Sequence, residues 1–473
     1  MMVQKILSYE DSKFLNPKLF EVYGDSIWEG VKLLEGVIEK SNHLDFVGYN
    51  LDNLESPIYI FKEKNSKNHL AVKICGRYQD WDITASIKSL ISDVDKPDFV
   101  IIDNDSKSII LAGETTDTIP LGNSELQRKG RIIIAAKQKI PFLYKCPGTH
   151  FDDSKLSTSD RAAGKRGEAR YLMPYSVIFH FILSIRYKIP SLLFIQQNKE
   201  SDNALNFKID NSSENHFYDY ISLMLLLKLS DKEDIKKDLD KRIFQSSISF
   251  LNQKLNQKKI IDKIEIEPIV TNVSKNSKLF FSSFIKYLHS KSNKIDDVLK
   301  ITNWNYKSFP KWNNSHLCKP DKPINKKNWL FKKLIEKNVI KNYSYQSGTS
   351  RPGIVTDTSK LIELIVNNTQ IKKNKLEQRL KVDLPTLIIP TLAYQWEDIN
   401  TFKTSKKDPG TGEVCYFSEF FAFNENGEKI QNILIYIYIK SPPNGISTNN
   451  SLFKAIKMYH DCLIIDDEIY ELN

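Results

Sequence analysis

Four short runs of apolar and β-branched residues between positions 56 and 113 predict β-strands. Polar turn formers separate the members of each pair, so each pair predicts an antiparallel hairpin. The runs are SPIYIFKE (56–63), HLAVKICG (69–76), FVII (99–102) and SIILAG (108–113). In the second hairpin the turn is centred between Asp105 and Ser106, which places residue 98 opposite residue 113.

Helical spacing appears on both sides of these runs. Apolar side chains recur at Ile27, Val31, Leu34 and Ile38, a spacing typical of a helix. The pattern predicts helices within residues 16–41, 120–139 and 177–187, and strands at 141–146 and 189–197. Strands and helices in this order indicate an α/β fold, with a mixed sheet flanked by helices.

Two acidic residues lie at the open end of the second hairpin. Asp98 precedes its first strand and Glu114 follows its second, so the pairing brings their backbones to about 5 Å from each other. Carboxylates this close repel each other unless a cation lies between them, and oxygen ligands of this kind suit Mg²⁺ or Mn²⁺. The alternative is that both are ordinary strand-end acids that face water.

The net charge of +10 is concentrated in one window. Residues 251–350 contain 20 lysines and no arginine against seven acidic residues. Such an excess is expected of a surface that neutralises phosphates. Five of the chain's ten arginines fall between Arg128 and Arg170, where a planar guanidinium suits phosphate oxygens. The alternatives are solvated lysine-rich helix faces and structural ion pairs.

Composition excludes several classes of protein. The five cysteines are scattered without a CxxC pair, which argues against a structural zinc site and fits a reducing cytoplasm. The apolar runs are too short to cross a bilayer, so we expect a soluble cytoplasmic protein with no membrane partner. No Walker motif occurs, which argues against an ATP-driven translocase.

The motifs of residues 16–200 resemble those of the PD-(D/E)xK nuclease superfamily, and in particular type II restriction endonucleases. The resemblance rests on Pro97-Asp98 at the start of one strand, Gly113-Glu114-Thr115 at the end of the next, and the helix and strand that follow. It implies a restriction-endonuclease-like fold in which Asp98 and Glu114 bind Mg²⁺, or Mn²⁺ in its place. Glu29 or Glu35 on the first helix matches a further acid of that site.

Thr116 departs from the family pattern, because a lysine usually follows the glutamate by two positions. That lysine ordinarily orients the attacking water, so the resemblance implies that another residue takes its role. Lys129 is our first candidate, with Gln127 and Lys137 on the same predicted helix as alternatives.

The rest of the chain divides into two further regions after the nuclease-like domain at 1–200. Residues 201–300 are expected to form a helical connecting region, and residues 301–473 an α+β DNA-recognition region. Within it, a helix and a basic hairpin at 326–355 resemble the recognition helix and wing of winged-helix domains; an ordinary surface helix and turn are the alternative. The expected DNA contacts are Lys326, Lys327, Lys332, Lys333 and Arg351, with Arg128 and Arg131 in the first domain.

Together these features predict an enzyme, a metal-dependent type II site-specific deoxyribonuclease that hydrolyses phosphodiester bonds of double-stranded DNA. Cleavage of both strands implies a homodimer or higher oligomer, and a restriction enzyme implies a cognate methyltransferase in the same cell. The alternative is a DNA-binding regulator or defence-complex subunit whose nuclease fold no longer cuts. Asp98 and Glu114 favour the enzyme, and Thr116 favours the alternative.

Overall fold

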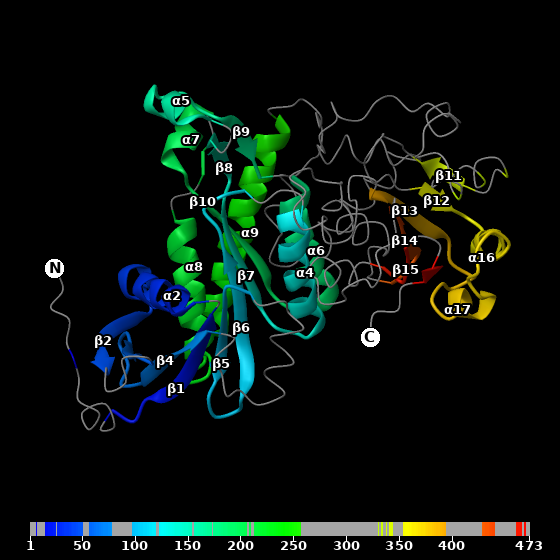
Figure 1. Ribbon diagram of the computed structural model, residues 1–473. Helices are drawn as coiled ribbons and strands as arrows, with labels where there is room; N and C mark the ends of the chain where they lie inside the picture. The colour runs from blue at the N-terminus through cyan, green and yellow to red at the C-terminus, as the bar shows by residue number, and fades with distance from the viewer. Residues whose placement is uncertain are drawn as a thin grey trace. The chain divides into compact units, whose positions relative to one another are not determined.

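The computed structural model describes the chain in two compact units, the first formed mainly by residues 1–119 and 131–258 and the second mainly by residues 278–473 (Figure 1). Each unit is described by itself. The described residues, apart from single positions, are 15–50, 56–77, 97–119, 123–153, 156–205, 208–209, 212–256, 340–343, 353–393, 428–439 and 460–469, with Ile6, Leu330, Lys333 and Lys337.

The first unit is built on an eight-stranded mixed sheet with the order β10-β7-β6-β5-β1-β4-β3-β2. Strands β6, β7 and β10 are parallel to one another, β1 is parallel to β4, and the remaining neighbours are antiparallel. The strands are β1 (Lys18–Gly24), β2 (Leu44–Asn50), β3 (Ile58–Glu63), β4 (His69–Arg77), β5 (Phe99–Asp103), β6 (Ser108–Thr115), β7 (Phe142–Pro147) and β10 (Ser191–Gln196).

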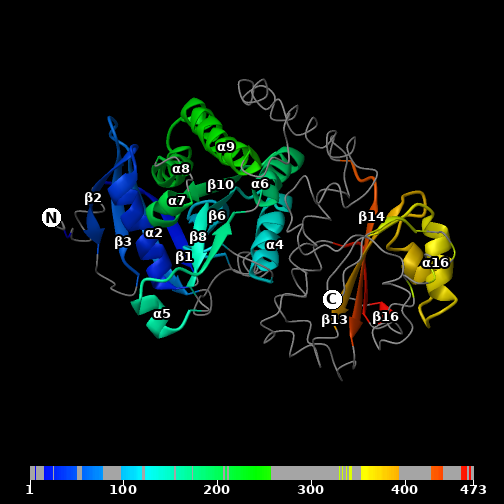
Figure 2. The same cartoon turned by 90° about the horizontal axis from the view of Figure 1, so that it is seen from above.

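Helices cover both faces of this sheet. On one face, α2 (Ile27–Lys40) and α8 (Ser213–Leu226) share a core with the sheet that includes Phe99 and Phe217. Helix α9 (Glu233–Asn256) packs along β10 at the sheet edge. On the other face lie α4 (Asn123–Lys137) and α6 (Pro174–Tyr187), side by side (Figures 1 and 2). The expected mixed sheet flanked by helices is therefore present.

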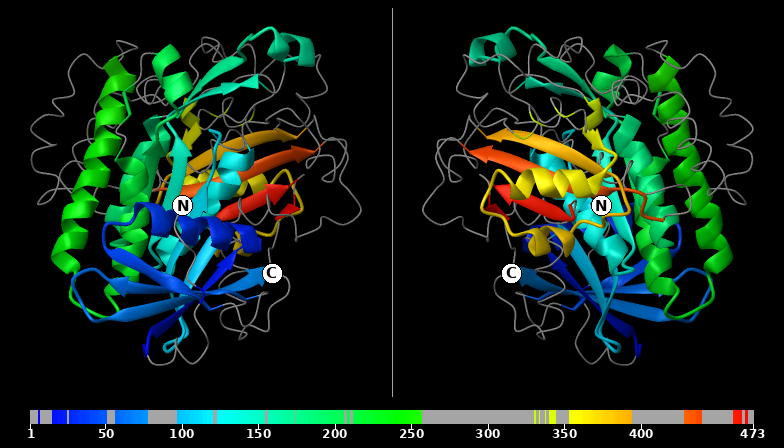
Figure 3. Two further views of the ribbon diagram at one scale, coloured as in Figure 1. Left: turned by 90° about the vertical axis from the view of Figure 1, so that its left-hand side faces the viewer. Right: turned by 90° about the vertical axis from the view of Figure 1, so that its right-hand side faces the viewer.

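A smaller element extends from the carboxyl ends of β7 and β10. It consists of the antiparallel pair β8 (Thr149–Asp152) and β9 (Glu168–Tyr171), with the short helices α5 (Thr158–Ala162) and α7 (Lys199–Ala204) (Figure 3). Two of its arginines are engaged in ion pairs: Arg166 contacts Glu200, and Arg170 contacts Asp152 and Glu168. Arg161 donates to the Leu156 carbonyl at 3.2 Å. Ion pairing was the alternative explanation for this arginine cluster.

The second unit contains a six-stranded sheet with the order β11-β12-β13-β14-β15-β16. The hairpin expected near residues 341–355 is present as an antiparallel pair, β11 (Ile340–Tyr343) and β12 (Gly353–Val355). Strand β12 also pairs antiparallel with β13 (Thr386–Ala393), and β13 is parallel to β14 (Asn432–Ile439), which is parallel to β15 (Cys462–Ile465). Strand β16 (Glu468–Ile469) pairs antiparallel with β15 at the end of the sheet. Helices α16 (Thr358–Val366) and α17 (Lys373–Glu377) complete its core.

One predicted helix is partly wrong. The segment 16–41 begins with strand β1, in which Phe20 and Val22 are buried on one face of the sheet, and the helix starts only after Ser26. Strand β2 was not predicted at all. Helices α8 and α9, which lie in the predicted helical region, pack on the first sheet. No helix among the described residues is long and apolar enough to cross a membrane.

Candidate active site

The hairpin formed by β5 and β6 carries the two predicted acids, and its pairing differs by one residue from the prediction. Next to the turn, Asp103 pairs with Ser108, which is the expected register. At the other end Phe99 lies opposite Gly113, where residue 98 was expected. The turn was therefore predicted correctly and the register at the acidic end was wrong.

A β-bulge explains the difference. The register shifts between Ile101 and Ile102, where Ile110 is an extra residue on β6. A bulge of this kind inserts one residue, bends the strand and advances the pairing by one position beyond it. As a result Asp98 lies level with Glu114, and both remain at the same end of the hairpin, as the sequence predicted.

Asp98 closes the hairpin with its side chain. Pro97 cannot donate a backbone hydrogen bond, so the strand ladder ends at this point. The amide of Thr115 donates to Asp98 Oδ2 at 2.7 Å, and the Thr115 hydroxyl donates to the same oxygen at 3.3 Å. The carboxylate therefore accepts hydrogen bonds in place of a backbone carbonyl of a paired strand, which fixes its position at the start of β5.

Glu114 is almost completely buried, with 1% of its surface exposed. Arg131 on α4 donates from Nη1 to both of its carboxylate oxygens, at 2.6 and 2.8 Å. A buried carboxylate requires such a partner, because removing a charge from water without compensation is very unfavourable. Arg131 was predicted to contact DNA, and here its guanidinium is engaged with the acid of the predicted site.

Glu29, on α2, lies near the same end of the hairpin. Its Oε2 accepts a hydrogen bond from the Ser26 amide at 2.9 Å, so it caps the helix. Gly24, at the end of β1, separates this helix from the hairpin. A Cβ at Gly24 would lie 3.0 Å from the Asp98 carbonyl oxygen and 3.4 Å from Glu29 Cβ. Glu29 and Asp98 are thus neighbours, and glycine permits their close approach.

Glu35, the alternative to Glu29, belongs to a different environment. The hydroxyl groups of Tyr49 and Tyr59 donate to its Oε1 at 3.0 and 3.3 Å. Burial and this carboxylate raise the pKa of Tyr49 to about 12. Glu35 therefore anchors an aromatic cluster on the face of the sheet, and Glu29 is the acid of α2 that lies next to Asp98.

The acidic side chains at this end of the hairpin offer oxygen donors, which suit a hard divalent cation. Three carboxylates belong to this end of the hairpin: Asp98 and Glu114 lie level with each other, and Glu29 is the neighbour of Asp98. Oxygen donors are those that Mg²⁺ and Mn²⁺ prefer. As the side chains are arranged, no group of three His, Cys, Asp or Glu residues within the described part of the chain is placed to hold a metal ion. A cation at Glu114 would have to share that carboxylate with Arg131.

Thr116 stands where the family pattern has lysine, and Lys129 is the first candidate to take that role; the two lie in different surroundings. The Thr116 hydroxyl donates to the Thr118 carbonyl at 3.0 Å, and its amide donates to the Lys145 carbonyl at 2.9 Å. Lys129 lies on α4 and is 1% exposed. The side chain of Gln127 lies outside the described residues.

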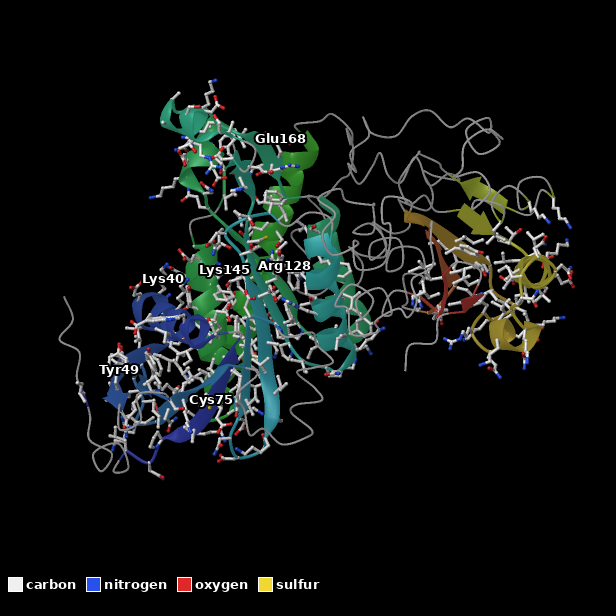
Figure 4. All side chains as sticks on the ribbon, viewed as in Figure 1. Lys40, Tyr49, Cys75, Arg128, Lys145 and Glu168 are labelled. Atoms are coloured by element: carbon white, nitrogen blue, oxygen red, sulfur yellow. The ribbon has the colours of Figure 1, made fainter. Side chains whose placement is uncertain are left out.

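Lys145 is a residue that the sequence analysis missed. It lies on β7 directly beside Thr115, the residue that binds Asp98. Its ammonium lies 5.0 Å from the ring centres of Phe217 and Tyr218 and 3.2 Å from the Tyr218 hydroxyl (Figure 4). A lysine within the fully buried strand FLYKCP interrupts an apolar run, and that interruption was the signal available in the sequence.

The environment of Lys145 is unfavourable for a charged amine. Burial lowers the pKa of Lys145 below its usual value, and the neighbouring Lys40 acts in the same direction. The Glu214 carboxylate, 3.9 Å from the ammonium, opposes this shift. Lysines with lowered pKa values in partly enclosed sites are common among catalytic groups.

The remaining predicted DNA contacts are only partly described. Arg128 is half-buried on α4 (Figure 4), and Lys333 bonds to Asn368 in the second unit. The other four predicted contacts lie outside the described residues: Lys326, Lys327, Lys332 and Arg351.

No protein family model matches this chain, and neither a curated protein nor a solved structure is significantly similar to it.

Proposed function

We propose that the protein is a metal-dependent, sequence-specific double-stranded DNA endonuclease of the restriction-endonuclease type. The observation that carries this proposal is that Asp98 and Glu114 lie at the same end of the β5–β6 hairpin, with Glu29 beside Asp98. The acids come from a helix and from a hairpin that is followed by α4 and the parallel strand β7. This order of elements supports the resemblance stated from the sequence.

Each residue has a defined part in the proposed reaction. Asp98 and Glu114 would hold Mg²⁺ or Mn²⁺, with Glu29 as a further acid. Such an ion, when bound, lowers the pKa of a coordinated water and stabilises charge on the phosphate. Thr115 fixes the Asp98 carboxylate through two hydrogen bonds, and Arg131 holds the Glu114 carboxylate in a water-excluded position.

We assign DNA reading to the second unit and its basic sequence. The β11–β12 hairpin has the antiparallel geometry that a wing requires, and Lys333 precedes it in the chain. Its continuation into three parallel strands makes the unit larger than a simple winged-helix domain. The lysine excess of residues 251–350 supports phosphate contacts in this part of the chain.

The test is to incubate the purified protein with long unmodified DNA, in Mg²⁺ and in EDTA, and to separate the products on a gel. We expect discrete fragments in Mg²⁺ and intact DNA in EDTA. Identical fragmentation in EDTA would contradict the metal requirement. Smeared degradation would contradict sequence specificity.

A second candidate function is DNA binding without cleavage. The ion pair between Glu114 and Arg131 favours it, because a guanidinium already satisfies the acid that should bind the metal. Thr116 in place of lysine points the same way. Intact DNA whose mobility shifts with protein in the same gel would support this function over the enzyme.

Lys145 provides a prediction that separates a catalytic role from a structural one. We expect Lys145→Met to reduce the cleavage rate at least tenfold, because Lys145 is the buried amine beside the Asp98–Thr115 pair. We also expect the variant to be as stable as the native protein at pH 7, or more stable, in denaturant unfolding. Since the folded-state pKa is lowered, the charged lysine destabilises the fold fully below that pKa, and the penalty shrinks as the pH rises from it towards the pKa of about 10.4 in the unfolded chain.

Lys40→Met is the matched control. Lys40 on α2 lies 2.7 Å from the same Glu214 carboxylate and 5.6 Å from the Tyr218 ring centre, but it belongs to neither strand of the site. Equal cleavage by both variants and the native protein would remove Lys145 from the proposed mechanism. A loss of stability that accompanies the loss of activity would make its role structural.

A further inference from the structure

A cavity with a volume of about 380 Å³ lies at the carboxyl end of β10, between the start of α8 and the middle of α9. This volume is within the range of about 300–1,000 Å³ that is typical of small-molecule sites. None of the residues placed at the candidate active site lines it. The cavity therefore requires its own explanation.

The described lining carries positive charge and no carboxylate. Lys208, His216 and Arg242 supply basic side chains, and no aspartate or glutamate is among the described residues that line the cavity. Arg242 is paired with Asp238 and donates to it from Nε and Nη2 at 3.0 and 2.6 Å. A guanidinium has five N–H donors, so this pair leaves Arg242 able to donate to a further anion.

Helix α9 presents a polar stripe to the cavity. Arg242, Gln245, Ser246 and Ser249 follow one another at helical spacing, and all four line it. On the face of a helix that packs against its neighbours, apolar residues are the norm. Small hydroxyl side chains here leave open space and provide hydrogen-bond donors and acceptors at the same time.

The floor of the cavity is apolar and closely packed. It is formed by Ile195, Ile209 and Phe250. The three side chains meet at Gly148, where a Cβ would lie 2.5 Å from Ile209 and 2.9 Å from each of the others. An apolar floor below a rim of cations suits a ligand with one flat or apolar part and one anionic part.

The basic rim is held in place by hydrogen bonds. Gln253 on α9 accepts from the Lys208 amide at 3.0 Å and donates to the Lys208 carbonyl at 2.7 Å. This pair of bonds fixes the backbone of Lys208 against α9. The backbone at Lys208 is thus preorganised, which reduces the entropy lost when an anion binds.

We propose that this cavity binds the phosphate group of a nucleotide unit, with the base or sugar against the apolar floor. The proposal goes beyond the proposed nuclease function and does not depend on cleavage. Because β6, β7 and β10 are parallel neighbours, the carboxyl end of β10, which lines the cavity, lies at the same end of the sheet as Glu114 on β6, and the two strands are about 10 Å apart. The phosphate could therefore come from a free mononucleotide or from a DNA strand.

Isothermal titration calorimetry with the full-length protein tests the proposal. The probes are thymidine 5′-monophosphate, thymidine without phosphate, and a short DNA duplex in EDTA. Two variants alter the cavity: Arg242→Gln removes a cation of the rim, and Ser249→Phe fills the space. Lys237→Gln is the matched control, since Lys237 is also an exposed, ion-paired cation of α9 and does not line the cavity.

We expect the monophosphate to bind at least tenfold more tightly than thymidine, and both cavity variants to lose at least tenfold in affinity while Lys237→Gln does not. A loss confined to the duplex would identify the ligand as a DNA strand. Unchanged affinity of both cavity variants for both phosphate-bearing probes would overturn the proposal. Thermal unfolding of each variant confirms that the fold is intact before binding is compared.

Discussion

Replacing Asp98 by asparagine is expected to abolish metal-dependent DNA cleavage and to leave the hairpin folded. The structural role of Asp98 is to accept hydrogen bonds from Thr115, and the asparagine side-chain oxygen is also able to accept them. Its proposed catalytic role requires a negative charge, which asparagine lacks. Losing a metal ligand removes several kcal/mol of transition-state stabilisation, so we expect about a thousandfold decrease in rate.

The matched control lies at the other end of the same hairpin. Asp105 is an exposed aspartate in the turn and pairs with Lys18 at 2.7 Å. Asp105→Asn should retain nearly full activity, because an exposed ion pair contributes little and the turn is far from the acids. Rates should be measured on supercoiled DNA over a range of Mg²⁺ concentrations. Full cleavage by Asp98→Asn would place the active site elsewhere, even in an enzyme that cuts DNA.

Replacing Arg131 by leucine is expected to reduce the free energy of unfolding by about 3–5 kcal/mol, because it leaves the buried Glu114 carboxylate without its guanidinium. The double variant Glu114→Gln, Arg131→Leu should be more stable than Arg131→Leu alone, since it removes the charge that lost its partner. Denaturant unfolding of both single variants and the double variant measures the coupling between the two residues.

Arg170→Leu is the control for this prediction. Arg170 also pairs with carboxylates, those of Asp152 and Glu168, but Glu168 is 62% exposed and water can replace the contact. We expect its loss to reduce stability by less than about 1 kcal/mol. If Arg131→Leu were no more destabilising than Arg170→Leu, the pair with Glu114 would not be a structural element of the fold.

The sequence predicted most of the first sheet because its strands are short, apolar and bounded by turn residues. The β5–β6 hairpin, α4 and β7 all occur where expected. Strand β1 was missed because its alternation covers only a few residues next to a strong helical pattern. Its stability comes from pairing with β4, about fifty residues later, and such a contact leaves no local signal.

The candidate site was predictable in position but not in side-chain arrangement. The placement of Asp98 and Glu114 at one end of a hairpin follows from the turn alone, and the bulge at Ile110 changes only the register. The pairing of Glu114 with Arg131 depends on how α4 crosses the sheet, which a linear sequence does not specify. Lys145 could have been found, because a lysine in a buried strand is unusual.

The two hydrogen bonds from Thr115 to Asp98 bear on the ion selectivity of the proposed metal site. A carboxylate that is already fixed loses little rotamer freedom when it meets a cation, so its geometry, rather than its charge, decides which ion fits. Mg²⁺ requires near-octahedral ligands at about 2.1 Å, whereas Ca²⁺ adapts to longer and more variable distances. A site built on such a rigid acid would discriminate between divalent ions by size, although both carry the same charge.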